Sequence, residues 1–333
     1  PPITFYLSSS AQPELIEHVR AAGRPFKLFH NWIGIPKPSD DWKCPLPRNP
    51  EFEYETYLYA TLFRSTACTG AGLNAVNRAL GLALFLNFDH ILVLGADCAT
   101  RSLGVRSMPP QGTASADYKA WLAEQEMYPP GNVASMAATS VLDTYGDDAA
   151  LVEGVIDGRP WATRPDMVIS AMNLLRLKQE HGHRIELVGD TLPNALIGKS
   201  EEFLKGMPQL SINSTVEGLV ARGTDTDGKS AESKATLYLV NQNRPHYEAH
   251  VRANAKYGRQ VVGPYNSCAG KTLVLCGAGP SLALDVGLLA TRPYDELWAC
   301  NRALPWLVKN GPRPTHALWV DPGPAWRDEW AVV

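Results

Sequence analysis

The sequence predicts a doubly wound α/β fold with a mainly parallel, Rossmann-like sheet and a long lid insertion, and three observations lead to this class. Short runs of β-branched or aliphatic residues recur along the chain, helix-length segments separate them, and five of the runs end in Asp or Asn. Strands that alternate with helices build a parallel sheet with helices against its faces. The length of 333 residues accommodates one large α/β domain with insertions.

Seven runs have the length, the apolar content and the flanking turn residues of buried strands. In chain order they are Ile3–Ser8, Phe26–Asn31, His90–Asp97, Ile185–Asp190, Thr272–Gly277, Glu296–Asn301 and His316–Asp321.

Four segments between or after these runs are predicted to be helices. Ala71–Asn87 is apolar nearly all round, apart from a polar patch near its start, so we expect a buried helix. Arg164–His181 opens with Pro165, which suits the first turn of a helix. Ser281–Ala290 and Ala303–Asn310 each follow a strand and are predicted to be shorter helices.

Three stretches lack sustained periodicity. Gly34–Glu55 is rich in proline and is predicted to be a long surface loop. Thr100–Trp161 is rich in Gly, Pro and Ser, with helix-like pieces at Ala114–Met127 and Val133–Tyr145, and such a segment is typical of a lid or inserted subdomain. The polar segment Arg222–Ser233 is predicted to be a flexible linker.

Charge and composition exclude several classes of protein. Lys and Arg number 31 against 34 Asp and Glu, and the net charge of -3 argues against a surface that coats nucleic acid or a polybasic membrane anchor. The longest apolar stretch, Ala79–Phe88, is about half of the roughly 20 residues that a membrane-spanning helix needs. We therefore expect neither nucleic acid nor a membrane as a partner.

The sequence also predicts a cytoplasmic protein. Its first ten residues, PPITFYLSSS, lack the basic and apolar regions of a secretory signal peptide. Its six cysteines include no C-x-x-C pair, and Cys98, Cys276 and Cys300 lie in or at the ends of apolar strand-like runs. Buried thiols in a reducing compartment are expected, and disulfides or zinc are the less favoured alternative.

The polar residues that end predicted strands include Asp97, Asp190, Asn301 and Asp321. Because the carboxyl ends of parallel strands form the ligand crevice of open α/β sheets, these side chains are expected along one rim. The alternative is that each residue merely starts a turn, as Asp and Asn commonly do.

The sharpest local motif is the strand-turn-helix KTLVLCGAGPSLALDVGLL, residues 271–289. Gly277 and Gly279 have no Cβ atoms that would keep a phosphate from the backbone, and Ser281 stands where a helix start offers N–H groups. The motif lacks the third glycine of the dinucleotide fingerprint, where Leu282 stands, and the Lys-Ser/Thr of a P-loop. It is predicted to hold a phosphate, and a tight strand-to-helix turn is the alternative.

The segments GAGPSL, ELWACN and NGPRPTHALWVDP together resemble the N-terminal part of the 6-hydroxymethylpterin diphosphokinase MptE-like family. Its relatives include the motility accessory factor glycosyltransferases, which are similar in fold to bacterial sialyltransferases that use a CMP-sugar. Two further blocks resemble the same family. They are a Thr-Gly turn before a helix and HILVLGADCA, and DGRPWATRPDM before a helix and IELVGDTLPNALIG.

The resemblance implies a site for a nucleotide or nucleotide-sugar, with a CMP-sugar as the favoured type and no metal in a glycosyl transfer. The implied residues are Gly277, Gly279, Pro280, Ser281 and Asn301 as nucleotide contacts, Thr69 and Gly70 facing the nucleotide-sugar, Asp97 as the strand-end acid, and Asp321 in the VDP block. In the glycosyl transfer that we favour, Asp97 is the catalytic base.

Two departures from the sialyltransferases bear on the mechanism. Ala278 replaces the Asn between their two glycines. Their catalytic histidine precedes the long helix, whereas this chain has no histidine between Ser102 and Glu180, and Trp161 stands near the corresponding position.

The favoured function is an enzyme that transfers an activated sugar from a small-molecule nucleotide donor to a hydroxyl group on a protein or glycan acceptor. The first alternative is a diphosphokinase that uses ATP and Mg²⁺, in which Asp97 and Asp321 hold the metal. The second is a nucleotide-binding or structural protein that keeps the fold without the chemistry, and the absent histidine motivates it.

The family blocks occur in circularly permuted order, because the GPSL block comes last in this chain and first in the family. The strand that starts at Ile3 should then lie next to the strand that ends at Asp321. This order divides the chain into the second part of the sheet at 1–99, a lid at 100–162, a helix-strand block at 163–221, a linker at 222–233 and the nucleotide-binding block at 234–333.

Overall fold

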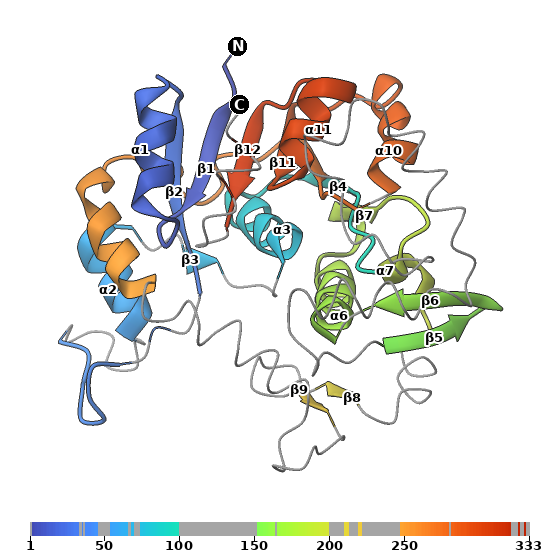
Figure 1. Ribbon diagram of the computed structural model, residues 1–333, viewed down its shortest axis with the longest axis horizontal. Helices are drawn as coiled ribbons and strands as arrows, with labels where there is room; N and C mark the ends of the chain where they lie inside the picture. The colour runs from blue at the N-terminus through green and yellow to red at the C-terminus, as the bar shows by residue number, and fades with distance from the viewer. Residues whose placement is uncertain are drawn as a thin grey trace.

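A computed structural model of the protein describes residues 2–32, 35, 37–45, 54–65, 68–69, 74–99, 152–163, 165–199, 210–212, 219–221, 247–279, 281–320, 326 and 330. Eight strands form one sheet in which every neighbouring pair runs parallel, and helices cover both faces (Figure 1). The predicted doubly wound α/β class is therefore confirmed. From edge to edge the strands are β3 (Cys68–Thr69), β2 (Phe26–Asn31), β1 (Thr4–Ser8), β12 (His316–Trp319), β11 (Glu296–Cys300), β10 (Thr272–Cys276), β4 (His90–Leu94) and β7 (Ile185–Leu187).

All seven predicted strands are present in this sheet, and four of them end before the polar residue that was expected to close them. Residues in the left-handed region of φ explain three of these early ends. Gly95 follows β4 with a φ of +64°, Gly189 follows β7 with +90°, and Asn301 follows β11 with +43°. A residue with positive φ turns the chain out of the extended conformation, so the polar residues lie in the loops beyond the strands.

The predicted helices are present, and the structure adds elements that the sequence analysis missed. The additions include two antiparallel hairpins, two helices on the first half of the chain and the two-residue strand β3. The predicted helix pieces 114–127 and 133–145 and the linker 222–233 lie outside the described residues. The remaining elements are α1 (Pro13–Ala21), α2 (Tyr54–Phe63), α3 (Ala75–Leu86), β5 (Val152–Ile156), β6 (Arg159–Thr163), α6 (Pro165–His181), η2 (Gly182–Arg184), α7 (Leu192–Ala195), β8 (Leu210–Ile212), β9 (Leu219–Ala221), η3 (Ala255–Tyr257), α10 (Ser281–Asp285), η4 (Val286–Ala290) and α11 (Ala303–Asn310).

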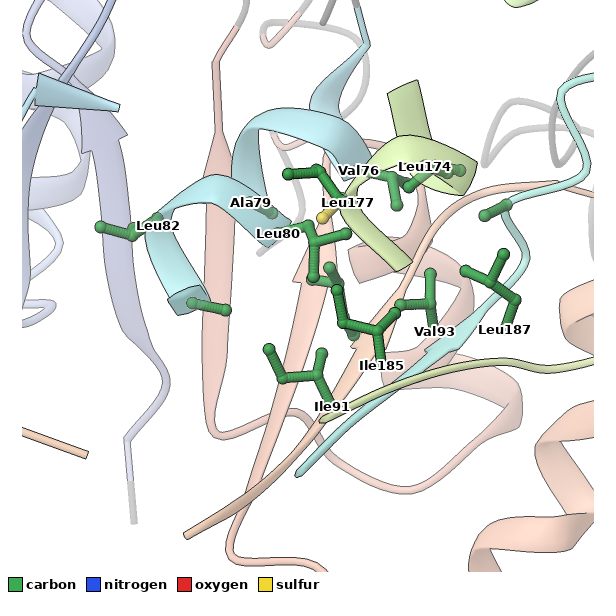
Figure 2. Close-up of a cluster of buried hydrophobic side chains, with 14 of the residues drawn as sticks. Val76, Ala79, Leu80, Leu82, Ile91, Val93, Leu174, Leu177, Ile185 and Leu187 are labelled. Carbon is green, nitrogen blue, oxygen red and sulfur yellow. The ribbon is translucent and has the colours of Figure 1, made fainter. Parts of the chain in front are cut away.

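Helices α3 and α6 cover one face of the sheet. Leu80 of α3 and Leu177 of α6 belong to a buried cluster with Ile91 and Val93 of β4 and Leu187 of β7 (Figure 2). Helix α3 touches both the sheet and α6, and this explains why its sequence is apolar nearly all round. The predicted buried helix is confirmed.

Helices α1, α2, α10 and α11 contribute to the core on the other face. Leu92 and Leu94 of β4 alternate with the residues of the first cluster and join a second one, which includes Leu15 of α1, Tyr59 of α2 and Leu304 of α11. Successive side chains of a strand point to opposite faces, so the same strands serve both cores. Buried strands of this kind are apolar almost throughout rather than alternating.

The strands nearest the two ends of the chain are neighbours in the sheet. Thr4 of β1 pairs with His316 of β12, and both strands run in the same direction. This is the placement that the permuted order of blocks predicts for the strands beginning at Ile3 and ending at Asp321. Pro1, Asp321 and Val333 themselves lie outside the described residues.

The order of the strands contains a topological switch point between β4 and β10. From β10 the chain continues to β11 and β12 toward one edge, whereas from β4 it continues to β7 at the other edge. Open α/β sheets bind ligands outside the carboxyl ends of two strands whose connections diverge in this way. The fold therefore directs attention to the loops that follow β4 and β10.

Two other expectations concern membranes and thiols. Within the described part of the chain, no helix combines the length and the apolar content needed to cross a membrane. Cys268, Cys276 and Cys300 are buried free thiols, and Cys44 is a half-buried one. Burial raises the pKa of the Cys276 thiol, because a thiolate would lose its hydration there.

Candidate functional site at the switch point

The loops that follow β4 and β10 contact each other through their backbones. The Gly277 N–H donates to the Leu94 carbonyl over 2.8 Å, and the Gly279 N–H donates to the Gly95 carbonyl over 2.9 Å. We call the described residues of these loops, 95–98, 277–279 and 281–282, the switch-point site.

Neither glycine of the GAG motif has room for a side chain. A Cβ atom on Gly277 would overlap the Gly95 carbonyl and lie 2.7 Å from Cγ2 of Val76 in α3. A Cβ atom on Gly279 would overlap the Asp97 carboxylate. The sequence predicted both glycines as places where a phosphate approaches the backbone. In this structure the Gly95 carbonyl and the Asp97 carboxylate occupy the space beside them.

Asp97 lies inside the switch-point site, with 8% of its surface exposed. Its Oδ2 accepts the backbone N–H of Ser281 over 3.0 Å at the start of α10. Burial raises the pKa of Asp97 to about 6, the charges of Asp285 and Asp190 act in the same direction, and the hydrogen bond from Ser281 opposes them. A carboxyl group with a pKa this close to neutrality is suited to accept and return a proton.

Three of the N–H groups around the predicted phosphate cradle are engaged within the protein. The Ser281 N–H binds Asp97, the Leu282 N–H donates to the Gly279 carbonyl over 3.0 Å, and the Gly279 N–H donates to the Gly95 carbonyl. The Asp97 carboxylate is therefore the anion that meets the Ser281 N–H here. A phosphate gains that N–H group only by displacing Asp97 from it.

Asn301 lies directly after the next strand, β11. Its φ of +43° is strained, and its side-chain oxygen has no hydrogen-bond partner. Its N–H donates to the Leu318 carbonyl over 2.9 Å, and its carbonyl accepts Nε1–H of Trp330 over 3.0 Å. Its side-chain Oδ1 is buried without a hydrogen-bond partner. Buried polar atoms are normally paired, so this amide oxygen is available to a donor on a ligand.

Asp285 is a residue of this region that the sequence analysis missed. It ends α10, its Oδ2 is buried without a hydrogen-bond partner, and a Cβ atom on Gly189 would overlap its carboxylate. Burial raises the pKa of Asp285, and the charge of Asp190 adds to the effect. Its position four residues after Ser281 places it on the same side of the helix, which is the signal that sequence reasoning could have used.

The start of α3 is a second feature that was not predicted at this site. Asn74 caps α3 by accepting the Asn77 N–H over 2.8 Å, and its Nδ2 lies 3.9 Å from Sγ of Cys98. Cys98 has a φ of +53°, which is rarely populated by a residue other than Gly, Asn or Asp. Such strain persists only where the surroundings impose it, and it is concentrated at functional sites.

Thr69 lies in the edge strand β3 rather than in the loops that follow β4 and β10. Its Oγ1 donates to Oδ1 of Asn31 over 3.1 Å. β3 is the sixth strand from β4 in the order of the sheet, but it contacts α3, whose Val76 lies against Gly277. Among the described residues between Thr69 and α3, Asn74 lies next to Cys98 of the site. Gly70, Pro280 and Asp321, which were also predicted as contacts, lie outside the described residues.

The acidic side chains that the structure describes do not gather into a metal centre of their own. Among the described residues, no three Asp, Glu, His or Cys side chains are arranged to hold a metal ion. Trp161, which stands near the position of the sialyltransferase histidine, is a buried residue of β6.

Comparisons with known proteins add no relative. No protein-family model matches this chain, and neither the curated proteins nor the solved structures contain a match. The fold and the site therefore define a class: a doubly wound parallel α/β protein with a buried carboxyl group at its switch point.

Proposed function

We propose that the switch-point site binds the phosphate of a nucleotide or nucleotide-sugar and that the protein is a glycosyltransferase-like transferase. The observation that carries the proposal is the buried Asp97 carboxyl group, which accepts the Ser281 N–H where doubly wound proteins bind ligands. The resemblance of GAGPSL, ELWACN and the VDP block to the MptE-like family supports the same ligand class.

Each group has a role in this reaction. The Ser281 N–H binds a phosphate oxygen once Asp97 has left it, and Oδ1 of Asn301 accepts a hydrogen bond from the ribose or the base. Asp97 then takes the proton of the acceptor hydroxyl as that oxygen forms a bond to the sugar's anomeric carbon, while the bond from that carbon to the phosphate breaks and the nucleotide leaves. A positioned general base of this kind contributes roughly 10²–10⁴-fold to the rate.

A Mg²⁺-dependent diphosphokinase is the second candidate, because carboxylates gather around the proposed phosphate site. The charges of Asp285 and Asp190 raise the pKa of Asp97, and the charge of Asp190 raises that of Asp285. Carboxylates are the protein ligands that Mg²⁺ uses beside a phosphate. In this reaction Asp97 would hold the ion rather than accept a proton.

The test measures nucleotide release from CMP- and UDP-sugars and AMP formation from ATP, each with Mg²⁺ and with EDTA. Release that persists in EDTA and falls 10²–10⁴-fold in Asp97→Asn supports the glycosyltransferase. AMP formation that needs Mg²⁺ would favour the diphosphokinase. Asp89→Asn is the matched control, since Asp89 is an exposed residue just before the amino end of the same strand. Binding of a nucleotide without turnover in either assay would favour a nucleotide-binding protein.

A further inference from the structure

A second group of polar side chains lies away from the switch-point site, at the carboxyl ends of β1 and β2. Ser9 follows β1, His30 lies in β2 and Glu55 lies in α2. Oγ of Ser9 lies 2.6 Å from Nδ1 of His30, and Nε2 of His30 lies 2.8 Å from Oε1 of Glu55. We call these three residues the serine triad. β1 and β2 are the fourth and fifth strands from β4, roughly 19 and 24 Å away along the sheet, so the triad is separate from Asp97.

The hydrogen bonds fix where the protons of the triad lie when Glu55 is ionised. An ionised carboxylate only accepts, and Oε2 of Glu55 already accepts the Ile35 N–H over 2.8 Å. Oε1 therefore accepts from Nε2–H of His30. The neutral imidazole then has a lone pair at Nδ1, so the Ser9 hydroxyl donates its proton to Nδ1. The chain of donors runs from hydroxyl to imidazole to carboxylate.

This order is that of a serine nucleophile, its general base and the acid that orients the base, with the two ring nitrogens exchanged. Ser9 also has the right place in the fold, because it lies in the turn that leads from a strand into a helix, α1, at the carboxyl edge of the sheet. The N–H of the residue after such a nucleophile typically stabilises the oxyanion. Here that residue is Ser10, whose N–H makes only a long bond of 3.3 Å to Oγ of Ser8.

The neighbouring serines show that the arrangement is specific to Ser9. Ser8 and Ser10 are equally buried, yet their hydroxyl groups bind each other over 2.7 Å rather than a histidine. The His30 ring is also held in place from the side, because it stacks on the Tyr59 ring of α2 at 4.7 Å. Packing alone does not call for this network, since apolar replacements of buried ionic groups are often neutral or stabilising.

We propose that Ser9 is a nucleophile for acyl transfer and that its substrates are esters or thioesters. Oγ of Ser9 forms a bond to the carbonyl carbon while its proton passes to Nδ1 of His30. The bond to the leaving alcohol or thiol then breaks, and His30 returns the proton to that group. Water, deprotonated by His30, releases the carboxylic acid and restores Ser9. Glu55 is the positioning residue that keeps Nε2 protonated.

All three side chains are at most 1% exposed. The experiment must therefore test whether a small electrophile reaches the Ser9 hydroxyl in the folded protein. The full chain is treated with a small fluorophosphonate, which forms a P–O bond to an activated serine, expels fluoride and gives the hydroxyl proton to the base. Peptide mapping by mass spectrometry then locates the adduct. We expect one adduct per folded chain, on Ser9, and none in Ser9→Ala.

Matched variants separate the chemistry from the fold. Ser8→Ala and Ser10→Ala should keep the labelling rate, whereas Glu55→Gln should lower it at least about tenfold with thermal unfolding still cooperative. A folded protein without an adduct on Ser9 would overturn the proposal, because a nucleophile that a small electrophile cannot reach does not act as one. Equal labelling of Ser9 in the natural protein and in His30→Gln would overturn it as well. Neither result depends on nucleotide binding at the switch-point site.

Discussion

Asp97 combines a favourable hydrogen bond with an unfavourable location for a charge. Its pKa is raised from the ordinary value of 3.8 to about 6, chiefly by burial. Between these two pH values the folded state holds more protons than the unfolded state, so the free energy of unfolding falls as the pH rises from about 4 to about 6. The full penalty, about 3 kcal/mol for roughly two pKa units, is present above pH 6. Residues that destabilise a fold in this way are typical of functional sites.

Asp97→Asn should therefore stabilise the protein at neutral pH. The amide oxygen still accepts the Ser281 N–H, while the buried charge is gone. We expect a gain of up to about 3 kcal/mol in urea unfolding at pH 8 and little or no gain at pH 4. A loss of stability at pH 8, or the same change at both pH values, would show that Asp97 is not ionised in the buried state described here.

Sequence reasoning found some residues of the switch-point site because their chemistry is local. Gly277, Gly279 and Ser281 stand in one strand-turn-helix motif, and Asp97 ends a strand. It missed the serine triad because Ser9, His30 and Glu55 come from three separate elements, and no local spacing joins them. The run of serines directly after a strand was the signal that pointed to that edge.

At the scale of elements, the loop between β10 and α10 has no space beside Gly279. A Cβ atom there would overlap both the Asp97 carboxylate and the Gly95 carbonyl. Gly279→Ala should lower the free energy of unfolding by about 1–3 kcal/mol, as overpacked positions do.

Gly287 provides the control for that substitution. Gly287 lies in η4, six residues after Ser281, and a Cβ atom on it would meet nothing within 4 Å. Gly287→Ala should leave stability within about 0.5 kcal/mol of the natural protein, as surface substitutions usually do. Equal urea midpoints for the two alanine variants would contradict the close contact at Gly279.

Helix α3 supports both the core and the switch-point site. Leu80 is fully buried in the cluster between the sheet and α6 (Figure 2). Cγ2 of Val76 lies against Gly277. Leu80→Ala should lower the free energy of unfolding by about 2–5 kcal/mol, because it leaves a cavity in a packed core. Chemical denaturation followed by circular dichroism measures this, with the exposed Leu284→Ala as control. A change below about 1 kcal/mol would contradict the packing of α3.

The elements that sequence reasoning predicted differ physically from those that it missed. The seven strands are short apolar runs bounded by turn residues, and burial on both faces of the sheet makes them stand out. Helix α2, YETYLYATLF, has aromatic residues around its whole circumference and no polar stripe, so no helical period marks it. β3 has two residues, too few for any period to show.

At the scale of the whole molecule, function depends on strand order, which local sequence does not encode. The switch point exists because Val274 of β10 pairs with Leu92 of β4, although residues 93–273 lie between them in the sequence. Likewise β1 pairs with β12 across the full length of the chain. Sequence periodicity predicts that such strands exist, whereas only their non-local pairing places Asp97 beside Ser281 and Thr69 at the far edge.

The central claim, that the switch-point site binds a nucleotide phosphate in place of the Asp97 carboxylate, is tested most directly by calorimetric titration. CMP, UDP and ADP are titrated into the natural protein and into Asp97→Asn at pH 5.5 and pH 8. Protonation of Asp97 removes the competing charge. The affinity of the natural protein should therefore rise from pH 8 to pH 5.5 by a factor roughly 10 to 100 times larger than the corresponding change in Asp97→Asn. Binding to neither protein at either pH, or the same pH dependence in both, would contradict the claim.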